Sequence, residues 1–147
     1  MYIQNRKAHF NYDILERFES GLVLQGFEVK AVRAGKGKLD GAYVIIRGNE
    51  AFLVGASISP YQPINTPKNY DPEQPRKLLL SKKELARLQT STTTAGLTIV
   101  PFKLYNKNGK IKLEIAIARG KKKHDKRETM KARDSKRDIE RTLKSQN

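Results

Sequence analysis

Apolar and polar residues alternate most regularly over residues 97–118, "LTIVPFKLYNKNGKIKLEIAIA". The pair Asn108-Gly109, which favours a tight two-residue turn, divides this run into two halves. In the second half, one side of the alternation is strongly apolar, at Ile111, Leu113, Ile115 and Ile117. A period of two is typical of a strand with one buried and one solvated face. The segment therefore predicts an antiparallel hairpin, with Pro101 at a sheet edge or a bulge.

A second hairpin is predicted over residues 42–58, "AYVIIRGNEAFLVGASI", where two apolar runs flank Gly48-Asn49. Residues 21–37, "GLVLQGFEVKAVRAGKG", do not alternate cleanly. Their β-branched residues and glycines still favour a strand, with Gly26 as a bulge or bend.

A short helix is predicted over residues 11–20, "NYDILERFES". Ile14, Leu15 and Phe18 fall at i, i+1 and i+4, which places them on one helical face. Asn11 is a possible cap, and Gly21 follows as a stop signal.

A second helix is predicted over residues 78–89, "LLLSKKELARLQ", where Ser81 and Glu84 have the spacing of a capping box. Residues 60–76, which precede it, contain five prolines and predict a long loop. A loop of this length in a small domain is more often functional than idle.

These segments predict a mainly β chain with five or six short strands and two helices. Strands joined by successive hairpins favour a small, closed or nearly closed antiparallel barrel with two or three helices on its outside. The OB-type barrel is the commonest nucleic-acid-binding architecture of that kind. A split α+β sandwich is the alternative. We assign residues 1–119 to this domain, a length suited to one compact unit.

Residues 120–147 have a different composition. They hold 11 of the 30 Lys and Arg and 5 of the 15 Asp and Glu, but only four apolar side chains, at Met130, Ala132, Ile139 and Leu143. Because that is too little apolar surface to offset the entropy of ordering, we expect a tail that is disordered when free. As a helix it would gather six cations within an arc of roughly 160°. The composition leaves two alternatives for these residues: they fold into a helix when they bind a polyanion, or they remain a disordered, adhesive tail.

The formal net charge is +15, and residues 1–119 alone carry 19 Lys and Arg against 10 acidic residues. A charge of this size favours nucleic acid as the partner, with an anionic membrane surface as the second choice. Several cations lie beside Gly- and Pro-rich segments, and we take as candidate phosphate contacts Arg6, Lys7, Lys30, Arg33, Arg76 and Lys77.

Other classes of function have little support. The chain has no Cys and two His, so neither a disulfide framework nor a Cys or His-rich metal site is expected. The "GKGKLDG" string at residues 35–41 lacks the dinucleotide-loop spacing, and the acidic residues form no catalytic grouping in sequence. The first ten residues have no signal-peptide core, and no apolar run approaches the roughly 20 residues of a membrane span. We expect a cytoplasmic protein that is not an enzyme and needs no cofactor.

Four strings then form an ordered set along the chain: "NRKAHFNYDILERFESGLVLQGFEVKAVRAGK", "NYDPEQPRKLLLSKKEL", "GLTIVPFKLY" and "ARGKKKHDKRETMKARD". In this order they resemble the SmpB family, the SsrA (transfer-messenger RNA) binding proteins of bacterial trans-translation. The resemblance covers nearly the whole chain, roughly residues 5–137.

The resemblance implies an OB-type barrel that binds the tRNA-like domain of transfer-messenger RNA. It also implies delivery of that RNA, with elongation factor Tu, to ribosomes stalled without a codon in the A site. The C-terminal tail would fold into a helix in the empty mRNA channel and decoding centre, against small-subunit rRNA. The expected partners are therefore transfer-messenger RNA and the ribosome, with elongation factor Tu as an indirect one, and the protein is expected to be a monomer.

Carried over position by position, the family's RNA contacts fall on Asn5, Arg6, Glu19, Leu79 and Ser81. Glu19 cannot bind phosphate, but it can accept hydrogen bonds from a base or a ribose hydroxyl, or orient an arginine. Ser81 departs from the family, which usually has Asn or His there, so its RNA contact is open.

In the tail, the string "HDKR" matches the family's decoding-centre motif, at His124, Asp125, Lys126 and Arg127. The resemblance implies that His124 stacks on an rRNA base and that Lys126 and Arg127 bind the rRNA backbone. The start of the chain departs from the family, because members often carry a longer basic lead than the four residues before Asn5.

Two rival interpretations are open. A basic ribosomal or ribosome-assembly protein could use the same barrel and tail, and it would bind rRNA without preferring a tRNA-like fold. An enzyme acting on RNA would need a carboxylate pair or a His set in a pocket.

Overall fold

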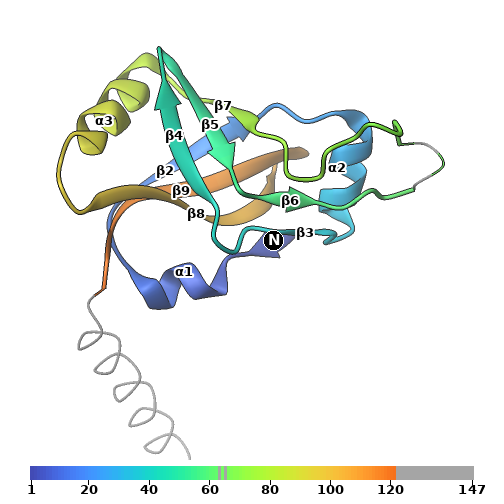
Figure 1. The fold of residues 1–147 in the computed structure, drawn as a ribbon, viewed down its shortest axis with the longest axis horizontal. Coiled ribbons are helices and arrows are strands. Elements are labelled where there is room, and N and C mark those ends of the chain that lie inside the picture. Colours follow the sequence, from blue (N-terminus) through green and yellow to red (C-terminus); the bar gives the residue numbers. More distant parts are fainter. Residues whose placement is uncertain (63, 65, 122–147) are drawn as a thin grey trace, which may run out of the picture.

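Strands outnumber helices in the computed structural model, which describes residues 1–62, 64 and 66–121. In chain order the described elements are β1 (Ile3–Gln4), α1 (Arg6–Asn11), β2 (Tyr12–Leu22), α2 (Gly26–Arg33), β3 (Gly37–Lys38), β4 (Tyr43–Arg47), β5 (Glu50–Val54), β6 (Ser57–Ile58), β7 (Arg76–Leu79), α3 (Lys82–Thr92), β8 (Leu97–Lys107) and β9 (Lys110–Gly120). The three helices of this part of the chain lie at separate places around the strands (Figure 1).

Seven strands form one antiparallel sheet in the order β1-β8-β9-β2-β7-β5-β4, and β3 pairs with β6 separately. The sheet curls so far that β4, at one end of this order, lies against β8 near the other end. The predicted mainly β, antiparallel barrel with flanking helices is therefore confirmed.

The barrel interior is filled by the inward-facing residues of the strands. Its fully or almost fully buried side chains include Leu53, Ile99, Leu104, Leu113 and Ile115. The apolar side of the predicted alternation in β9 faces this core, as expected. The opposite side of β9 is not solvated throughout, because α1 packs over it and buries Ala116 and Ala118 against Phe102 and Ala8.

Both predicted hairpins are present. β4 pairs with β5 around Gly48, and β8 pairs with β9 around Asn108-Gly109, where both turn residues have positive φ. This backbone suits the Asn-Gly pair, which tolerates the left-handed region better than other residues do. The register of β8 on β9 shifts between Pro101 and Lys103, so Pro101 lies at a bulge, as one of the two predictions for it required.

The helix predicted over residues 11–20 is wrong. The observed helix α1 is capped by Asn5, six residues before the predicted cap Asn11, and the Asn5 side-chain oxygen accepts a hydrogen bond from Ala8 N at 3.2 Å. Residues 12–22 are instead a strand that pairs with β9 over most of its length. A register shift between Ile14 and Glu16 leaves Leu15 55 % exposed, which is why the apolar residues did not alternate.

The strand predicted over residues 21–37 is also wrong in its middle, because α2 occupies Gly26–Arg33. Gly26 is the first residue of a helix, not a bulge. The overlooked signal is Glu28, whose Oε1 accepts a hydrogen bond from Gln25 N at 3.0 Å, as in the second half of a capping box. The inward face of α2 buries Ala31 and Val32.

The helix predicted over residues 78–89 is confirmed in type, but it starts later, at Lys82. Ser81 Oγ accepts a hydrogen bond from Glu84 N at 3.2 Å, and Glu84 Oε1 accepts one from Ser81 N at 3.0 Å. This is the capping box that the sequence indicates. The preceding leucines belong to β7 and its exit, because they pair with β2 and β5.

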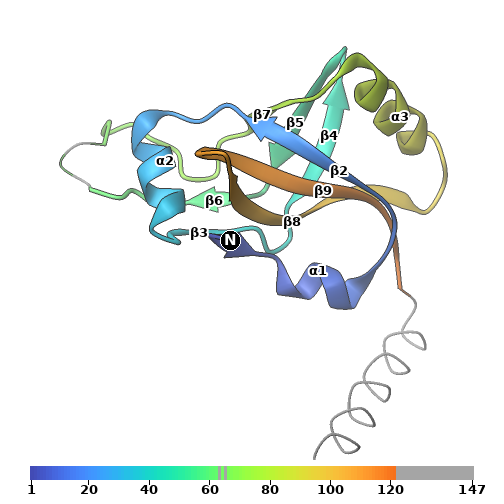
Figure 2. The ribbon, with the colours of Figure 1, turned by 180° about the vertical axis from the view of Figure 1, so that it is seen from behind.

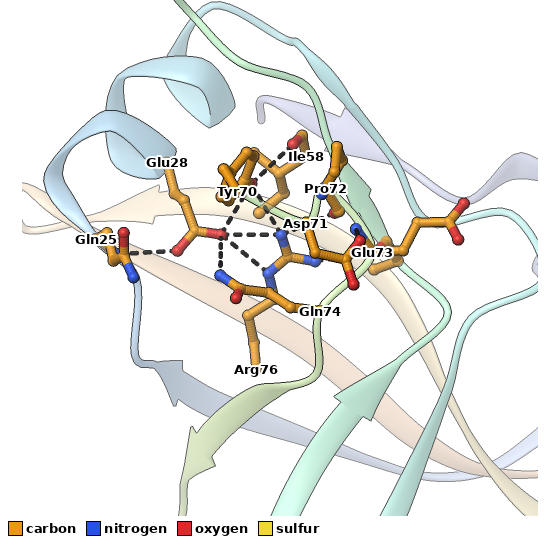
Figure 3. Close-up of polar contacts among 10 residues, drawn as sticks. Gln25, Glu28, Ile58, Tyr70, Asp71, Pro72, Glu73, Gln74 and Arg76 are labelled. Atoms are coloured by element: carbon orange, nitrogen blue, oxygen red, sulfur yellow. Dashed lines mark hydrogen bonds and ion pairs between the residues drawn. The ribbon is translucent and has the colours of Figure 1, made fainter. Parts of the chain in front are cut away.

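A buried ion pair joins α2 to β7 (Figure 3). Arg76 Nη2 lies 2.8 Å from Glu28 Oε2, and each side chain is 2 % exposed. The guanidinium also donates to Ala56 O and Pro72 O, at 2.9 and 2.8 Å, and to the Tyr70 hydroxyl at 3.0 Å. Burial and the nearby carboxylate of Glu28 raise the pKa of Tyr70. The network holds the long loop before β7 against the barrel.

We predict that Glu28→Gln destabilises the fold by about 3–5 kcal/mol, because it leaves the Arg76 guanidinium buried without a counter-charge. Urea unfolding followed by circular dichroism would measure this loss. The matched control is Glu50→Gln, which breaks an ion pair to Lys77 whose side chains are 45 % and 51 % exposed. The control should cost less than about 1 kcal/mol. Equal losses for the two variants would contradict a structural role for the buried pair.

Candidate nucleic-acid interface

The outer surface of β7, β2, β9 and β8 gathers several of the predicted RNA contacts. Gly21 pairs with Leu79 across β2 and β7. A Cβ atom on Gly21 would lie 3.0 Å from Leu79 Cβ, so the Leu79 side chain lies over this glycine and remains 54 % exposed. Glu19 and Lys77 are each two residues away on the same strands, and therefore share this face. We call the surface formed by Glu19, Lys77, Leu79, Tyr105 and Lys107 the outer-sheet face.

The Glu19 carboxylate is held by two side chains from β8. The Tyr105 hydroxyl donates to Glu19 Oε2 at 2.5 Å, and Lys107 Nζ lies 3.0 and 3.2 Å from Oε1 and Oε2. The hydrogen bond from Tyr105 and the one from Lys107 lower the pKa of Glu19 below its ordinary value. Burial and the hydrogen bond to Glu19 raise the pKa of Tyr105. Glu19 is therefore ionised and oriented at neutral pH.

Further charges line the outer-sheet face along β2 and β9. Glu114 Oε1 lies 2.7 Å from Arg17 Nη1, and Glu114 Oε2 lies 3.6 Å from Lys103 Nζ. Lys112 on β9 adds another cation, which contributes to the low pKa of Glu19. Cations thus outnumber carboxylates around Glu19, and the acidic residues that would repel phosphate are each paired with a cation.

The basic surface continues around the hairpin tip to α2. Arg33 Nη2 donates to Gly109 O at 3.1 Å, which ties the end of α2 to the turn between β8 and β9. Figure 2 shows this turn beside α2. Lys30 is exposed on the same helix, and Lys110 follows the turn. Lys30 and Arg33 therefore lie near the Lys107 end of the outer-sheet face.

The predicted contacts on α1 divide into two kinds. Arg6 and Lys7 are exposed, as a phosphate contact requires. Asn5 is 2 % exposed, and its side-chain nitrogen donates to Leu39 O and Pro101 O at 3.2 and 2.9 Å. Because its oxygen also caps α1, the Asn5 side chain is occupied by the fold. A groove of about 520 Å³ runs beside α1, and its lining includes Asn5, Lys7, Tyr12, Asp40, Tyr43 and Thr98.

The comparisons with known proteins agree along the whole chain. The family described as "SmpB protein" matches residues 2–145. The SsrA-binding protein of Thermosynechococcus vestitus is 50% identical over 141 residues, which cover 96% of this chain and 93% of that protein. The SsrA-binding protein of Paraburkholderia xenovorans is 48% identical over 143 residues, with 97% of each chain covered. The chain belongs to the SmpB family.

A solved structure described as "tmRNA-SmpB: a journey to the center of the bacterial ribosome" contains a chain with a similar fold. The TM-score is 0.68 at 43% sequence identity, and the match covers 82% of this chain and 85% of that one. The resemblance that the sequence strings indicated is therefore confirmed at the level of the family.

Among the contacts predicted from charge, Arg76 is the one whose environment differs most from the prediction. Its guanidinium was expected to contact phosphate, but it is buried, paired with Glu28 and bonded to two backbone carbonyls. A phosphate could reach it only if this network opened. Its neighbour Lys77 points the other way and is exposed, because successive residues of a strand face opposite sides.

Ser81 lies at the exposed N-cap of α3, two residues beyond Leu79. Its hydroxyl already accepts the capping hydrogen bond, which leaves its own proton available to a ligand. The decoding-centre candidates of this SmpB-family chain, His124, Asp125, Lys126 and Arg127, lie outside the described residues.

Tyr105 and Lys107 were not singled out from the sequence. The predicted hairpin could have placed both on its outward face, because they are two residues apart. Their contact with Glu19 spans 86 and 88 residues of sequence, and no local pattern reports it. Among the described residues, no group of three or more His, Cys, Asp or Glu could hold a metal ion, and no helix is long and apolar enough to cross a membrane.

We predict that Tyr105→Phe raises the pKa of Glu19 toward its ordinary value, because the larger of the two stabilising hydrogen bonds is lost. In the wild type the folded-state pKa is lowered. The stability contributed by ionised Glu19 is thus present at neutral pH and lost as the pH falls through that value. NMR titration of the side-chain carboxyl would measure both midpoints. Tyr43→Phe, on β4, is the control and should leave the titration of Glu19 unchanged. If the Glu19 midpoint in Tyr105→Phe equals that of the wild type, the Tyr105 hydroxyl does not stabilise the carboxylate.

Proposed function

We propose that this chain binds the tRNA-like domain of transfer-messenger RNA and acts with it in trans-translation on stalled ribosomes. The observation that carries the proposal is membership of the SmpB family over residues 2–145, with relatives named SsrA-binding protein at about half identity. The structural neighbour described with transfer-messenger RNA and the bacterial ribosome supports the same assignment.

The outer-sheet face is the surface that we assign to the tRNA-like domain. Phosphates would contact Lys77 of this face, Lys30 and Arg33 of α2 and, on α1, Arg6 and Lys7, since phosphate contacts supply most of the affinity of RNA-binding proteins. Glu19 and Leu79 have no charge that attracts phosphate. They are suited to an unpaired base, which offers N–H donors at its edge and an apolar face.

The ribosome contacts are assigned to the C-terminal segment. Its "HDKR" string would place His124 on an rRNA base and Lys126 and Arg127 on the rRNA backbone in the decoding centre. Residues 1–119 would act as the RNA-binding domain and residues 120–147 as the probe of the empty mRNA channel. Elongation factor Tu would join through the RNA, without a site on this chain.

A binding role accounts for the surface without catalysis. Near the outer-sheet face, Glu19 and Glu114 are engaged by Arg, Lys or Tyr side chains, and these contacts lower the pKa of Glu19, which makes it a weaker general base. We propose a cytoplasmic, monomeric RNA-binding protein that needs no cofactor. A basic ribosomal or assembly protein with the same fold is the second candidate, favoured by the charge alone.

The test of the proposal is a competition gel shift at about 150 mM salt, where non-specific electrostatic binding is weak. Labelled tRNA-like domain of transfer-messenger RNA would compete with bulk tRNA and with an rRNA fragment. We expect binding that resists both competitors. Equal displacement by every RNA would mean that the protein recognises charge alone, and the ribosomal-protein candidate would replace this one.

We predict that removing residues 122–147 leaves binding to the tRNA-like domain nearly intact but abolishes peptide tagging on stalled ribosomes. The truncation begins after Lys121 because Lys121 N still donates to Asn11 O at 2.8 Å, so β9 keeps its last contact with the body. Gel shift and a reconstituted tagging assay would measure the two properties. A large loss of RNA affinity would contradict the division between body and tail.

A second prediction concerns the base-recognition role of the outer-sheet face. Leu79→Ala should weaken binding to the tRNA-like domain by about tenfold, because it removes exposed apolar surface that a base would cover. Leu15→Ala is the matched control, since Leu15 is equally exposed, at 55 % against 54 %, but protrudes from the bulge in β2. The control should bind as the wild type does. Equal effects of the two variants would remove Leu79 from the site.

A further inference from the structure

Tyr105 reaches across a strand to contact Glu19. It lies on β8, whereas Glu19 lies on β2, and β9 runs between them. The ring is kept in place by its neighbours, because it is partly buried and Lys103 Nζ lies 5.2 Å from the ring centroid. A tyrosine side chain has few rotatable bonds, so its hydroxyl is a fixed point on the outer-sheet face.

Glu19 would otherwise be a flexible surface side chain. An exposed glutamate loses rotamer freedom when it binds a ligand, and that cost reduces affinity. Here the hydroxyl of Tyr105 fixes Oε2, and Lys107 bridges both oxygens. A carboxylate has about four acceptor positions, of which these contacts use three. The remaining acceptor position is on Oε1. Glu19 is exposed and lies on the same face as Gly21, two residues along β2, and the Leu79 side chain lies over Gly21.

We propose that Tyr105 is a positioning residue for RNA recognition: it holds Glu19 so that Oε1 accepts a hydrogen bond from an N–H group of an unpaired base that rests on Leu79. The inference deepens the proposed function and rests on it. The chemistry of the ligand follows from Glu19, which accepts hydrogen bonds, and from Leu79, which is apolar. Phosphate has no donor for Oε1, whereas the amino and imino groups of bases do, and Leu79 offers a base an apolar surface.

The other charged groups around Glu19 do not replace Tyr105 in this role. Lys107 carries a charge that also attracts phosphate, so its substitution would change both the contact with Glu19 and the attraction of phosphate. Lys112 acts on Glu19 through its charge, and Arg17 and Lys103 are engaged by Glu114. Tyr105 contributes a hydrogen bond without a charge, and Tyr105→Phe therefore removes positioning while it leaves the electrostatic field of the face intact.

The experiment is a double-mutant cycle of Tyr105→Phe and Glu19→Ala in the full chain, with binding of the labelled tRNA-like domain measured at about 150 mM salt. We expect Tyr105→Phe to weaken binding by about five- to tenfold, which is within the range for the loss of one typical hydrogen bond. Glu19→Ala should weaken it further. The double variant should bind no more weakly than Glu19→Ala alone, because a residue that acts only through Glu19 has no effect once Glu19 is absent.

Two further measurements separate positioning from other roles. The slope of log affinity against log salt should be unchanged in Tyr105→Phe, since no phosphate contact is lost, whereas Lys107→Gln should reduce its magnitude by about 0.7–0.9 if it binds one phosphate. The urea unfolding midpoint of Tyr105→Phe should also stay close to that of the wild type, since Glu19 lies outside the core. Leu15→Ala, which removes an exposed side chain at the bulge of β2, is the control and should leave the affinity and the salt slope unchanged.

Three results would overturn the inference. Wild-type affinity in Tyr105→Phe would show that the hydroxyl is not used. A loss that adds in full to that of Glu19→Ala would show that Tyr105 acts on the RNA independently of Glu19. A reduced salt slope in Tyr105→Phe would assign its effect to phosphate binding. If instead the wild type does not distinguish the tRNA-like domain from bulk tRNA, the proposed function fails, and this inference fails with it.

Discussion

The buried pair of Glu28 and Arg76 is the constraint on which the rest of the structure depends. Two charges removed from water must satisfy each other, and they do so only if α2, the loop before β7 and β7 itself take up one arrangement. Arg76 is the first residue of β7, so the pair also sets which side of that strand faces outward. Lys77 and Leu79 therefore point to the surface as a consequence of an interaction buried between α2 and β7.

β2 links β7 to the rest of the candidate interface, because it pairs with β9 on one side and with β7 on the other. Its inward face buries Phe18 and Ser20, and its outward face carries Glu19 and Gly21. The absence of a side chain at Gly21 gives Leu79 room to lie across the strand. One strand thus brings together residues that are about sixty positions apart in the chain.

The sequence predicts the parts of the fold whose signals are local. Asn108-Gly109 specifies its turn, Ser81 and Glu84 specify the start of α3, and the alternation in β9 reports its buried face. Residues 12–22 were assigned the wrong element because their pairing with β9 is long-range, whereas residues 26–33 were assigned the wrong element because the local capping signal of Glu28 was overlooked. A bulge disguised the alternation of β2, and the capping carboxylate of α2 is also one half of a buried ion pair.

The difference between local and long-range signals also limits how much of the candidate site the sequence predicts. The family resemblance located Glu19 and Leu79, and charge located Lys77 and Arg33, but neither showed which of the cations is buried. Arg76 and Lys77 are both cations, but Arg76 is buried and Lys77 is exposed, because successive side chains of a strand face opposite sides. The burial of Arg76 against Glu28 and the pairing of β7 with β2 and β5 together decide which of the two is exposed.

A carboxylate within the cationic surface that we assign to RNA has a physical reason. Lysines and arginines attract every phosphate alike, so they supply affinity that falls with salt but little discrimination between RNAs. An ionised acceptor discriminates, because it accepts only where an N–H or O–H group is presented. The repulsion that Glu19 would exert on phosphates is offset by Lys107, which contacts both of its oxygens. The surface can therefore combine strong electrostatic attraction with a single directional contact, which neither charge type could provide alone.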